Sequence, residues 1–368
     1  MSKNIQKICW SVTLFLILNP VISIAAFVVY LIFSNQYTGS EVLWISIFGL
    51  VFGVLTNLSI TMGYHRLFSH KSFEAHPILQ NILLFISAGA FQGSALKWSS
   101  DHRIHHRYED TDRDPYSINR GFWHAHMGWM MKDETVSLPI VAPDLEKNKW
   151  VMNQHNYYGY WSIGVGYVLP TIVGAFLGNA FLGLVIAGGL RIFLTQQSTF
   201  LVNSLSHTLG KTPYSNEKTA KDSIIVAVLT HGEGYHNFHH KFQIDYRNGI
   251  RWYHWDPTKW SIQLAALVGL ANKLRTVQFS EILRARLQTE TEKFYQSKFY
   301  EEKLNPLHER IIQSQIRFEQ LKKEYQVSSR EKMDQIKAEM QLAQIEFHAN
   351  MKMWKVLIRS ARRSNYLA

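Results

Sequence analysis

The sequence has one cysteine, Cys9, among its 368 residues. A single cysteine cannot form an intramolecular disulfide, and it cannot supply the several thiolates of a zinc or iron–sulfur cluster. A disulfide-stapled scaffold and a cysteine-based metal site are therefore excluded. Any metal ion that the chain binds must be held by nitrogen or oxygen atoms.

Charged residues are also missing from long stretches of the first half. Residues 8–33 and 42–62 contain no Asp, Glu, Lys or Arg, and neither does 160–177, whereas 180–202 contains only Arg191. A helix of about 20 apolar residues crosses the hydrocarbon core of a bilayer. Only short turns separate the first pair and the second pair. The sequence therefore predicts an all-α integral membrane protein with four transmembrane helices in two hairpins.

Two other interpretations of the apolar stretches are less favoured. A cleaved signal peptide has an apolar core of about 7–15 residues, which is shorter than the stretch over 8–33. Residues 78–96 are also apolar but include Gln80, Asn81 and Gln92. We interpret 78–96 as a re-entrant or interfacial helix, because a fifth crossing would divide the polar segments between the two sides of the membrane.

The distribution of Lys and Arg predicts the orientation in the membrane. Two of these residues precede the first span, ten lie in 63–158 and 26 follow residue 210, whereas the two short turns have none. Basic residues are retained on the cytoplasmic side. We therefore expect both termini and a helical cap formed by 63–158 and 203–279 to be cytoplasmic.

Eight of the 17 histidines fall in three short clusters within the polar segments. The clusters read His65-Arg-Leu-Phe-Ser-His70, His102-Arg-Ile-His105-His106 and His236-Asn-Phe-His239-His240. Residues three and four apart share one face of a helix, so the second and third clusters can each direct their rings to one point. The five-residue spacing of the first cluster fits the end of a helix that leaves the membrane.

Clustered imidazoles of this kind indicate metal binding. Imidazole suits first-row transition metals, whereas Ca²⁺ and Mg²⁺ prefer oxygen ligands. Eight histidines are too many for one ion, so we expect two. A zinc-dependent hydrolytic site stays open, although the chain has no His-Glu-x-x-His motif to supply a general base. The excess of imidazole without a paired carboxylate favours a pair of redox-active irons.

With their flanks, the three clusters resemble the membrane-bound fatty acid desaturases, in the stearoyl-CoA (acyl-CoA delta-9) branch. The likeness extends from about residue 8 to residue 275. The matching strings are Gly63-Tyr-His-Arg-Leu-Phe-Ser-His70, Trp98-Ser-Ser-Asp-His-Arg-Ile-His-His106, Asp114-Pro115, Arg120-Gly121-Phe122, His126-Met-Gly-Trp129, Asn203-Ser-Leu-Ser-His207 and Gly232-Glu-Gly-Tyr-His-Asn-Phe-His-His240.

The resemblance implies a set of metal ligands. Members of the family hold two Fe²⁺ ions with nine histidines, which by position are His65, His70, His102, His105, His106, His207, His236, His239 and His240. Asn203 matches a further ligand that reaches iron through a water molecule. His207 is isolated in the sequence, so only the resemblance selects it.

The resemblance also implies the reaction. With O₂ as co-substrate, such an enzyme introduces a cis double bond, at the delta-9 position in this branch, into a saturated acyl chain carried by CoA. Trp98 and Thr199 match residues that line the substrate tunnel, and Phe200 stands where the family has Trp. Arg120 matches a basic residue of the carrier site, but Ser100 replaces another that the animal members have.

Three alternatives to an acyl-CoA desaturase remain. Acyl chains bound to phospholipid are a second substrate class, and a di-iron hydroxylase on the same scaffold is a second reaction. A non-catalytic metal-binding or metal-transporting membrane protein is a third reading, from another functional class. It would need polar residues along a path through the spans, where Arg191 is the only charged one.

Beyond residue 279 the composition changes. The segment 280–368 has 17 Lys or Arg and 12 Asp or Glu, and apolar residues recur at a spacing of three and four from Met333 to Leu357. We therefore expect a membrane desaturase domain over 1–279 and a charged, amphipathic, coiled-coil-like helical tail over 280–368. A helix over 305–327 is expected to pair with the tail helix as an antiparallel hairpin.

Desaturation consumes electrons, yet the sequence has no His-Pro-Gly-Gly string of a cytochrome b5 and no Gly-x-Gly-x-x-Gly. We expect a separate electron donor, either a ferredoxin or a cytochrome b5-like protein with its reductase. The formal charge of +11 favours anionic lipid headgroups or an acidic redox partner. We expect no nucleic-acid partner.

Overall fold

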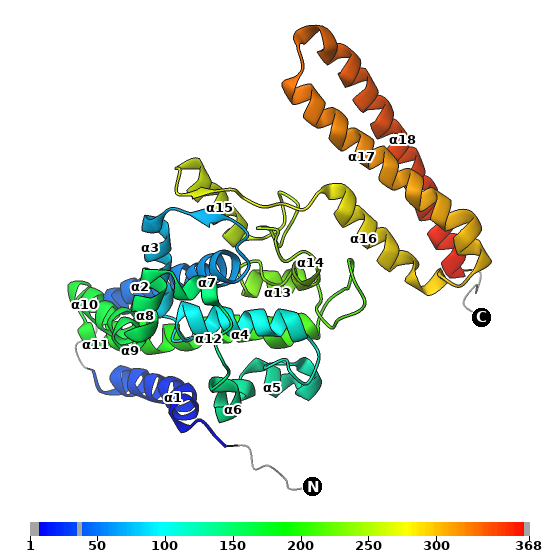
Figure 1. Ribbon diagram of the computed structural model, residues 1–368. Helices are drawn as coiled ribbons and strands as arrows, with labels where there is room; N and C mark the ends of the chain where they lie inside the picture. Colours follow the sequence, from blue (N-terminus) through cyan, green and yellow to red (C-terminus); the bar gives the residue numbers. More distant parts are fainter. Residues whose placement is uncertain (1–6, 35–38, 364–368) are drawn as a thin grey trace, which may run out of the picture. The chain divides into compact units, whose positions relative to one another are not determined.

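The computed structural model describes residues 7–34 and 39–363 (Figure 1). The chain divides into two compact units. The membrane unit comprises the residues up to Lys211 together with Lys218–Thr276, and the tail unit comprises Thr212–Glu217 and the residues from Val277 onward. The two termini, residues 1–6 and 364–368, lie outside the described residues. Residues 35–38, which make up most of the predicted first turn, also lie outside them.

Four helices of the membrane unit are long and apolar enough to cross a membrane, which confirms the predicted fold class. The first two are α1 (Trp10–Phe33) and α2 (Gly39–Ser59), which continues as the π-helical segment η1 (Ile60–Ser69). The third is built from α9 (Tyr158–Ile163), η4 (Gly164–Val168) and α10 (Leu169–Phe176), and the fourth from α11 (Ala180–Leu182), η5 (Gly183–Leu190), α12 (Arg191–Ser204) and η6 (Leu205–His207).

Glycine allows the second hairpin to close tightly. A Cβ atom on Gly174 would lie 2.5 Å from the Cα of Gly183, and one on Gly183 would lie 2.5 Å from the carbonyl oxygen of Pro170. Small residues let the backbones of membrane helices approach closely. The close approach positions η5, and α12 continues from η5 toward His207.

The one charged residue of the fourth span, Arg191, is bound by backbone carbonyl groups. Its guanidinium donates hydrogen bonds to the carbonyl oxygens of Ala187 (2.9 Å), Gly89 (2.7 Å) and Gly166 (3.1 Å). It also lies 4.6 Å from the centre of the Phe52 ring. A charge at membrane depth is costly unless it is satisfied in this way. Arg191 thus fastens the third and fourth spans to the turn after α3 (Pro77–Ala88).

The predicted helix over 78–96 is divided into two helices. α3 ends at Ala88, and α4 (Ala95–Tyr108) begins after a break in which Phe91 and Gly93 have φ of 54° and 86°. Such positive φ values are incompatible with a right-handed helix. Ser94 then caps α4 by accepting a hydrogen bond from the backbone N–H of Lys97 at 3.3 Å.

The remaining elements of the membrane unit are short. They are η2 (Ile118–Arg120), α5 (Phe122–His126), η3 (Gly128–Met131), α6 (Asp133–Val136), α7 (Pro143–Glu146), α8 (Lys149–Asn156), α13 (Ile224–Leu229), α14 (His236–Lys241) and α15 (Pro257–Leu267). Strands β1 (Glu74–Ala75) and β2 (Ala271–Asn272) pair antiparallel, with Glu74 opposite Asn272. This pairing joins the chain after the first histidine cluster to the chain after the third.

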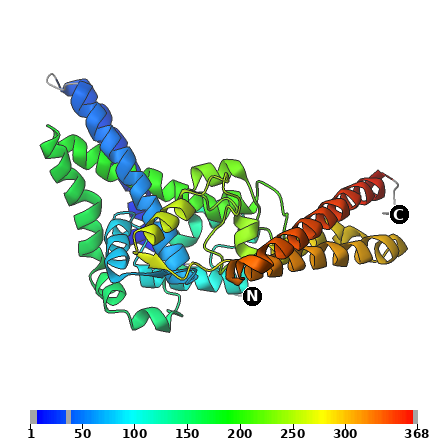
Figure 2. The same ribbon diagram turned by 90° about the horizontal axis from the view of Figure 1, so that it is seen from above.

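The tail unit is a helical assembly with its own apolar core. It contains α16 (Phe279–Thr291), η7 (Glu292–Phe294), η8 (Tyr300–Leu304), α17 (Asn305–Val327) and α18 (Arg330–Arg363). Figures 1 and 2 show α17 and α18 side by side as an antiparallel hairpin. The spacing of apolar residues predicts this amphipathic hairpin, and the buried side chains of Ile336, Ala343 and Trp354 lie on that face of α18.

Trp354 is the largest fully buried side chain of the tail unit, with 1% of its surface exposed. It packs among Leu287, Ile311 and Ile358, and its indole Nε1–H donates a hydrogen bond to Glu290 at 3.0 Å. The hairpin and α16 therefore share one core around this ring.

We predict that Trp354→Ala opens the tail hairpin. Truncating a buried Trp costs about 3–5 kcal/mol, which should appear as faster amide hydrogen exchange along α17 and α18 in the full chain. Lys355→Ala, at an exposed neighbouring position, should leave exchange unchanged. Equal protection in both variants would show that the hairpin does not depend on this core.

Candidate metal centre

Nine histidines of the membrane unit converge from four separate segments of the chain. They form a group of five, which is His65, His70, His102, His106 and His239, and a group of four, which is His105, His207, His236 and His240. Within each group the candidate ligand nitrogens all lie within 4.8 Å of one another. These are the nine histidines that the resemblance selects, and α4 and α14 each contribute to both groups.

The π-helical geometry of η1 explains the five-residue spacing of the first cluster. A π-helix has hydrogen bonds between residues five apart, and such segments are frequent at functional sites. The N–H of His70 donates to the carbonyl oxygen of His65 at 3.1 Å, so both rings lie on one side of the segment. Their ring centroids are 4.8 Å apart.

The inward-facing nitrogens lie at the separations expected of ligands to a shared ion. The Nε2 atoms of His65 and His106 are each 3.0 Å from Nε2 of His239, and those of His70 and His102 are 2.8 Å apart. With metal–nitrogen bonds of about 2.1 Å, two nitrogens bound at right angles lie about 3.0 Å apart. Five nitrogen donors also exceed the four of a structural zinc site.

The group of four has similar spacing. Nε2 of His236 lies 3.2 Å from Nε2 of His207 and 3.0 Å from Nε2 of His240. His105 completes the group, with its ring centroid 5.1 Å from that of His240. The donors thus fall into two adjacent sets rather than one.

Carboxylates on the outer side hold three of the rings and decide where their protons are. His105 Nδ1–H donates to Asp114 at 2.9 Å, and Nδ1 of His65 and His240 lies 2.8 Å from Glu233 and 2.7 Å from Glu109. A carboxylate at Nδ1 places the proton there and leaves Nε2 with a free lone pair. The Nε2 atoms of these three rings are then acceptors, and a cation in front of them would satisfy their lone pairs.

A hydroxyl group holds His207 in the same tautomer, with the proton on Nδ1. Its Nδ1 lies 2.7 Å from Oγ1 of Thr219, and that hydroxyl donates to Asp110 at 2.7 Å. Because the hydroxyl proton is directed to Asp110, the Thr219 oxygen accepts from Nδ1–H of His207. The Nε2 of His207 is therefore also free to bind a metal ion.

Burial keeps most of these imidazoles neutral. It lowers the pKa of His102, His106, His236, His239 and His240 well below the usual value, and neighbouring histidines lower it further. Neutral imidazole is the form that binds metals. The residues present therefore fit two transition-metal ions.

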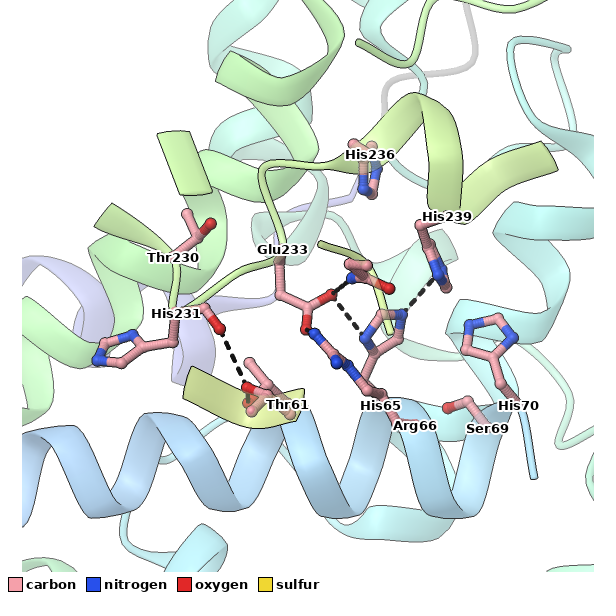
Figure 3. A network of polar contacts seen from close by, with 12 residues as sticks. Thr61, His65, Arg66, Ser69, His70, Thr230, His231, Glu233, His236 and His239 are labelled. Atoms are coloured by element: carbon pink, nitrogen blue, oxygen red, sulfur yellow. Dashed lines mark hydrogen bonds and ion pairs between the residues drawn. The ribbon is translucent and has the colours of Figure 1, made fainter. Parts of the chain in front are cut away.

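A buried ion network holds the first cluster against the third (Figure 3). One oxygen of Glu233, Oε1, accepts a hydrogen bond from Arg66 at 2.9 Å, and the oxygen that faces His65, Oε2, also accepts one from Asn248 at 2.7 Å. Arg66 also donates to Asp256 at 2.9 Å. Burial would raise the pKa of Glu233, but His65 and Arg66 outweigh it and hold the pKa at about 2. Glu233 is thus an ionised acceptor for the His65 ring.

A narrow, mainly apolar cavity shares a wall with the group of five. Its lining includes the ligand candidates His65 and His102 and, among the other predicted site residues, Trp98, Thr199, Phe200 and Asn203. The Trp98 ring stacks on His102 with centroids 4.9 Å apart. Thr199 accepts a hydrogen bond from Gln92 at 2.9 Å. The structure therefore brings four of the sequence-predicted side chains together at one cavity.

Arg120 does not line that cavity. It lies at a separate depression with Arg103, Arg107 and Arg113, and it donates to the carbonyl oxygen of Asp112. Arg103 is paired with Asp144 through two hydrogen bonds. The predicted carrier residue is thus part of a charged surface near α4, which Asp112, Asp114 and Glu134 also line.

The ring-holding partners are functional residues that the sequence reasoning did not assign. No local spacing in the sequence marks Glu109, Asp110, Thr219 and Glu233, because the residues that they contact lie in other segments of the chain. Asp114 follows His105 by nine residues, which is too far for contact on one helix. Only the turn after α4 brings its carboxylate back beneath the ring.

Comparison with known proteins identifies the family. The family model for fatty acid desaturase matches residues 42–265. Over 255 residues the chain is 41% identical to acyl-CoA desaturase 1 of Saccharomyces cerevisiae, covering 68% of this chain and 50% of that protein. Over 246 residues it is 41% identical to the probable acyl-CoA desaturase of Schizosaccharomyces pombe, covering 66% and 51%.

The human stearoyl-CoA desaturase is similar over a larger share of its own length. It is 34% identical over 260 residues, which cover 68% of this chain and 72% of the human protein. The chain spans about half the length of the two yeast relatives it matches. The matched region includes every helix that carries a histidine of the two groups. The chain is a multi-pass membrane protein and belongs to the fatty acid desaturase family.

Proposed function

We propose that the protein is an O₂-dependent acyl-CoA desaturase that introduces a cis double bond, at the delta-9 position, into a saturated acyl chain. The observation that carries this proposal is the cavity wall shared by apolar side chains and by His65 and His102. An alkyl chain in this cavity would lie directly against the candidate metal ligands. The names of the yeast and human relatives support acyl-CoA as the substrate.

The nine histidines would hold two iron ions, five at one and four at the other, and Asn203 would act through a water molecule. When bound, the pair supplies the oxidising power that breaks unactivated C–H bonds, which no side chain can supply. The outer carboxylates would keep the protons of His65, His105 and His240 on Nδ1, so that Nε2 of these three rings presents a lone pair. This arrangement also keeps the rings from rotating as substrates enter and leave.

The chain's own residues would select which methylene groups face the metals. Trp98 is held by its stacking on His102, so its indole forms a fixed wall beside the reacting carbons. The hydrogen bond between Gln92 and Thr199 would fix two further residues of the lining. Phe200 is 3% exposed and occupies less space than Trp, so it would set the width of the cavity.

The arginines of the depression near α4 would bind the phosphate groups of the carrier. Arg107, Arg113 and Arg120 lie along it, and guanidinium groups match phosphate geometry well. Phospholipid-bound chains are the competing substrate class. They present a single phosphodiester near the reacting chain, whereas CoA spreads several phosphates over a surface of this kind.

The topology and the electron supply complete the proposal. We place both termini and the histidine clusters on the cytoplasmic side, with residues 1–279 as the desaturase domain and 280–368 as an appended tail. The electrons would come from a separate ferredoxin, or from a cytochrome b5-like protein with its reductase. The positive charge of the polar segments supports an acidic donor.

Lipid analysis of a desaturase-deficient host tests the reaction. Expression of the chain should yield acyl products that are lighter by two hydrogens, with the double bond at the delta-9 position. Products heavier by one oxygen would identify a hydroxylase instead. Unchanged lipids with the intact protein in the membrane and a donor present would refute an acyl-modifying function.

Removal of single ligands tests the two metal groups separately. His239→Ala, in the group of five, and His105→Ala, in the group of four, should each abolish turnover and reduce bound iron to about half, because each group loses a central donor. Iron is measured in the purified protein. His348→Ala, at an exposed tail position, should retain both ions. Full iron content in both ligand variants would contradict the assignment.

Asp114→Asn tests the role of the outer carboxylates. The amide keeps nearly the same shape but can donate to His105 Nδ1 and so favour the wrong tautomer. Loss of such a partner usually costs about 10–100-fold in metal affinity, which competition with a chelator measures. Asp112→Asn, an exposed neighbour, is the matched control. Identical chelator sensitivity of the two variants would exclude the tautomer argument.

A further inference from the structure

Helix α18 of the tail unit has two apolar faces, of which only one is covered. The covered face carries Ile336, Ala343, Trp354 and Ile358, all buried against the rest of the tail unit. The other face carries Leu342, Ile345, Met353 and Val356, whose exposed fractions are 64%, 66%, 51% and 58%. We call these four residues, with the exposed Ala349 between them, the outer strip.

The outer strip is a continuous ridge rather than scattered side chains. Its members are separated by three or four residues, from Leu342 through Ile345, Ala349 and Met353 to Val356. At 3.6 residues per turn, this spacing keeps them within one narrow sector of the helix. The sector points away from the side of Trp354. Packing within the tail unit therefore does not account for it.

Basic residues border the outer strip on one side. From Phe347 to Arg363 the helix has five Lys or Arg and no Asp or Glu. By the same helical geometry Lys352, Arg359 and Arg363 lie along the edge of the strip, and all three are exposed. The other edge carries Glu339, which is paired with Arg317 at 3.5 Å, and Glu346.

We propose that this face of α18 lies on the anionic surface of a lipid bilayer. A helix with an apolar ridge and a basic flank binds in the plane of the interface, where the ridge enters the boundary between headgroups and acyl chains. Long Lys and Arg side chains keep their stems on the apolar surface while their charges reach the phosphates. Met353 and Val356, which lie beside the basic residues, would insert most deeply.

Charge favours lipid over a parallel second copy of the chain as the occupant. A parallel pairing of two α18 helices would bring five basic residues of each copy together without an acidic partner. An anionic surface instead neutralises all of them. Because the membrane unit of the same chain is anchored by four apolar helices, the tail is tethered near a bilayer, and weak attraction suffices. The proposal concerns residues outside the family match at 42–265 and does not depend on the reaction.

The test uses the full chain in lipid nanodiscs. With Cys9→Ser as background, Ala349→Cys carries an environment-sensitive dye on the outer strip, and Gln344→Cys carries it on another exposed side of α18. In discs that contain phosphatidylserine, the dye at 349 should report an apolar environment and be quenched by a lipid-borne quencher. The dye at 344 should stay in water, and discs of phosphatidylcholine alone should weaken the signal at 349.

Charge variants distinguish electrostatic binding to anionic lipid from nonspecific hydrophobic adsorption. Each Lys or Arg near an anionic surface contributes about fivefold to binding. Lys352→Gln, Arg359→Gln and Arg363→Gln together should therefore lower the ratio of bound to free tail by about 100-fold. The matched control is Arg310→Gln, Lys322→Gln and Lys323→Gln on α17, which removes the same charge from exposed positions and should have little effect.

Two results would overturn the proposal. One is a dye at 349 that stays in water in every lipid mixture. The other is a dye at 349 that reports an apolar environment independently of lipid charge and only in discs that contain two protein copies. That result would identify a second copy as the occupant. Circular dichroism and the unchanged dye signal at 344 show that the variants remain folded.

Discussion

The structure depends on one electrostatic constraint, the convergence of imidazole lone pairs at separations of 2.8–3.2 Å between Nε2 atoms. Unprotonated nitrogens at this distance repel one another, so the arrangement is stable only with cations between them or with strong support from behind. The protein supplies the support through Asp114, Glu233 and Glu109. Asp114 and Glu233 each hold a ring at its outer nitrogen, and Glu109 lies 2.7 Å from that of His240. Together they preset the site for metal.

The supporting residues also bind the polar segments of the membrane unit together. Asp256 accepts from Arg66 at 2.9 Å, caps α15 by accepting from the N–H of Lys259 at 2.9 Å, and accepts from the N–H of Asn248 at 2.9 Å. Removing one member of a buried ion network leaves an uncompensated charge, which costs about 3–5 kcal/mol. The metal centre and the fold of the polar segments are therefore one network, and neither can be altered without the other.

The two units bury apolar surface in different ways. In the membrane unit the long helices expose apolar side chains such as Leu50 and Phe176, at 71% and 86%, which is the expected pattern where lipid is the solvent. The tail unit buries a compact core around Trp354 as a water-soluble hairpin does. The outer strip of α18 is the exception, because it exposes apolar side chains on a helix that is not apolar enough to cross the membrane.

Much of this protein was determined by the sequence itself. Apolar stretches of about 20 residues must become helices in lipid, since no other local structure satisfies their backbone groups. The four spans, the amphipathic hairpin and eight of the nine histidines therefore follow from local patterns. The isolated His207 follows from the family resemblance and not from local spacing. The tertiary structure alone decided the division into five and four nitrogens and the contacts of four rings with Asp114, Glu233, Glu109 and Thr219. These contacts join residues as far apart as His65 and Glu233, and no local spacing records them because the folding of separate segments creates them.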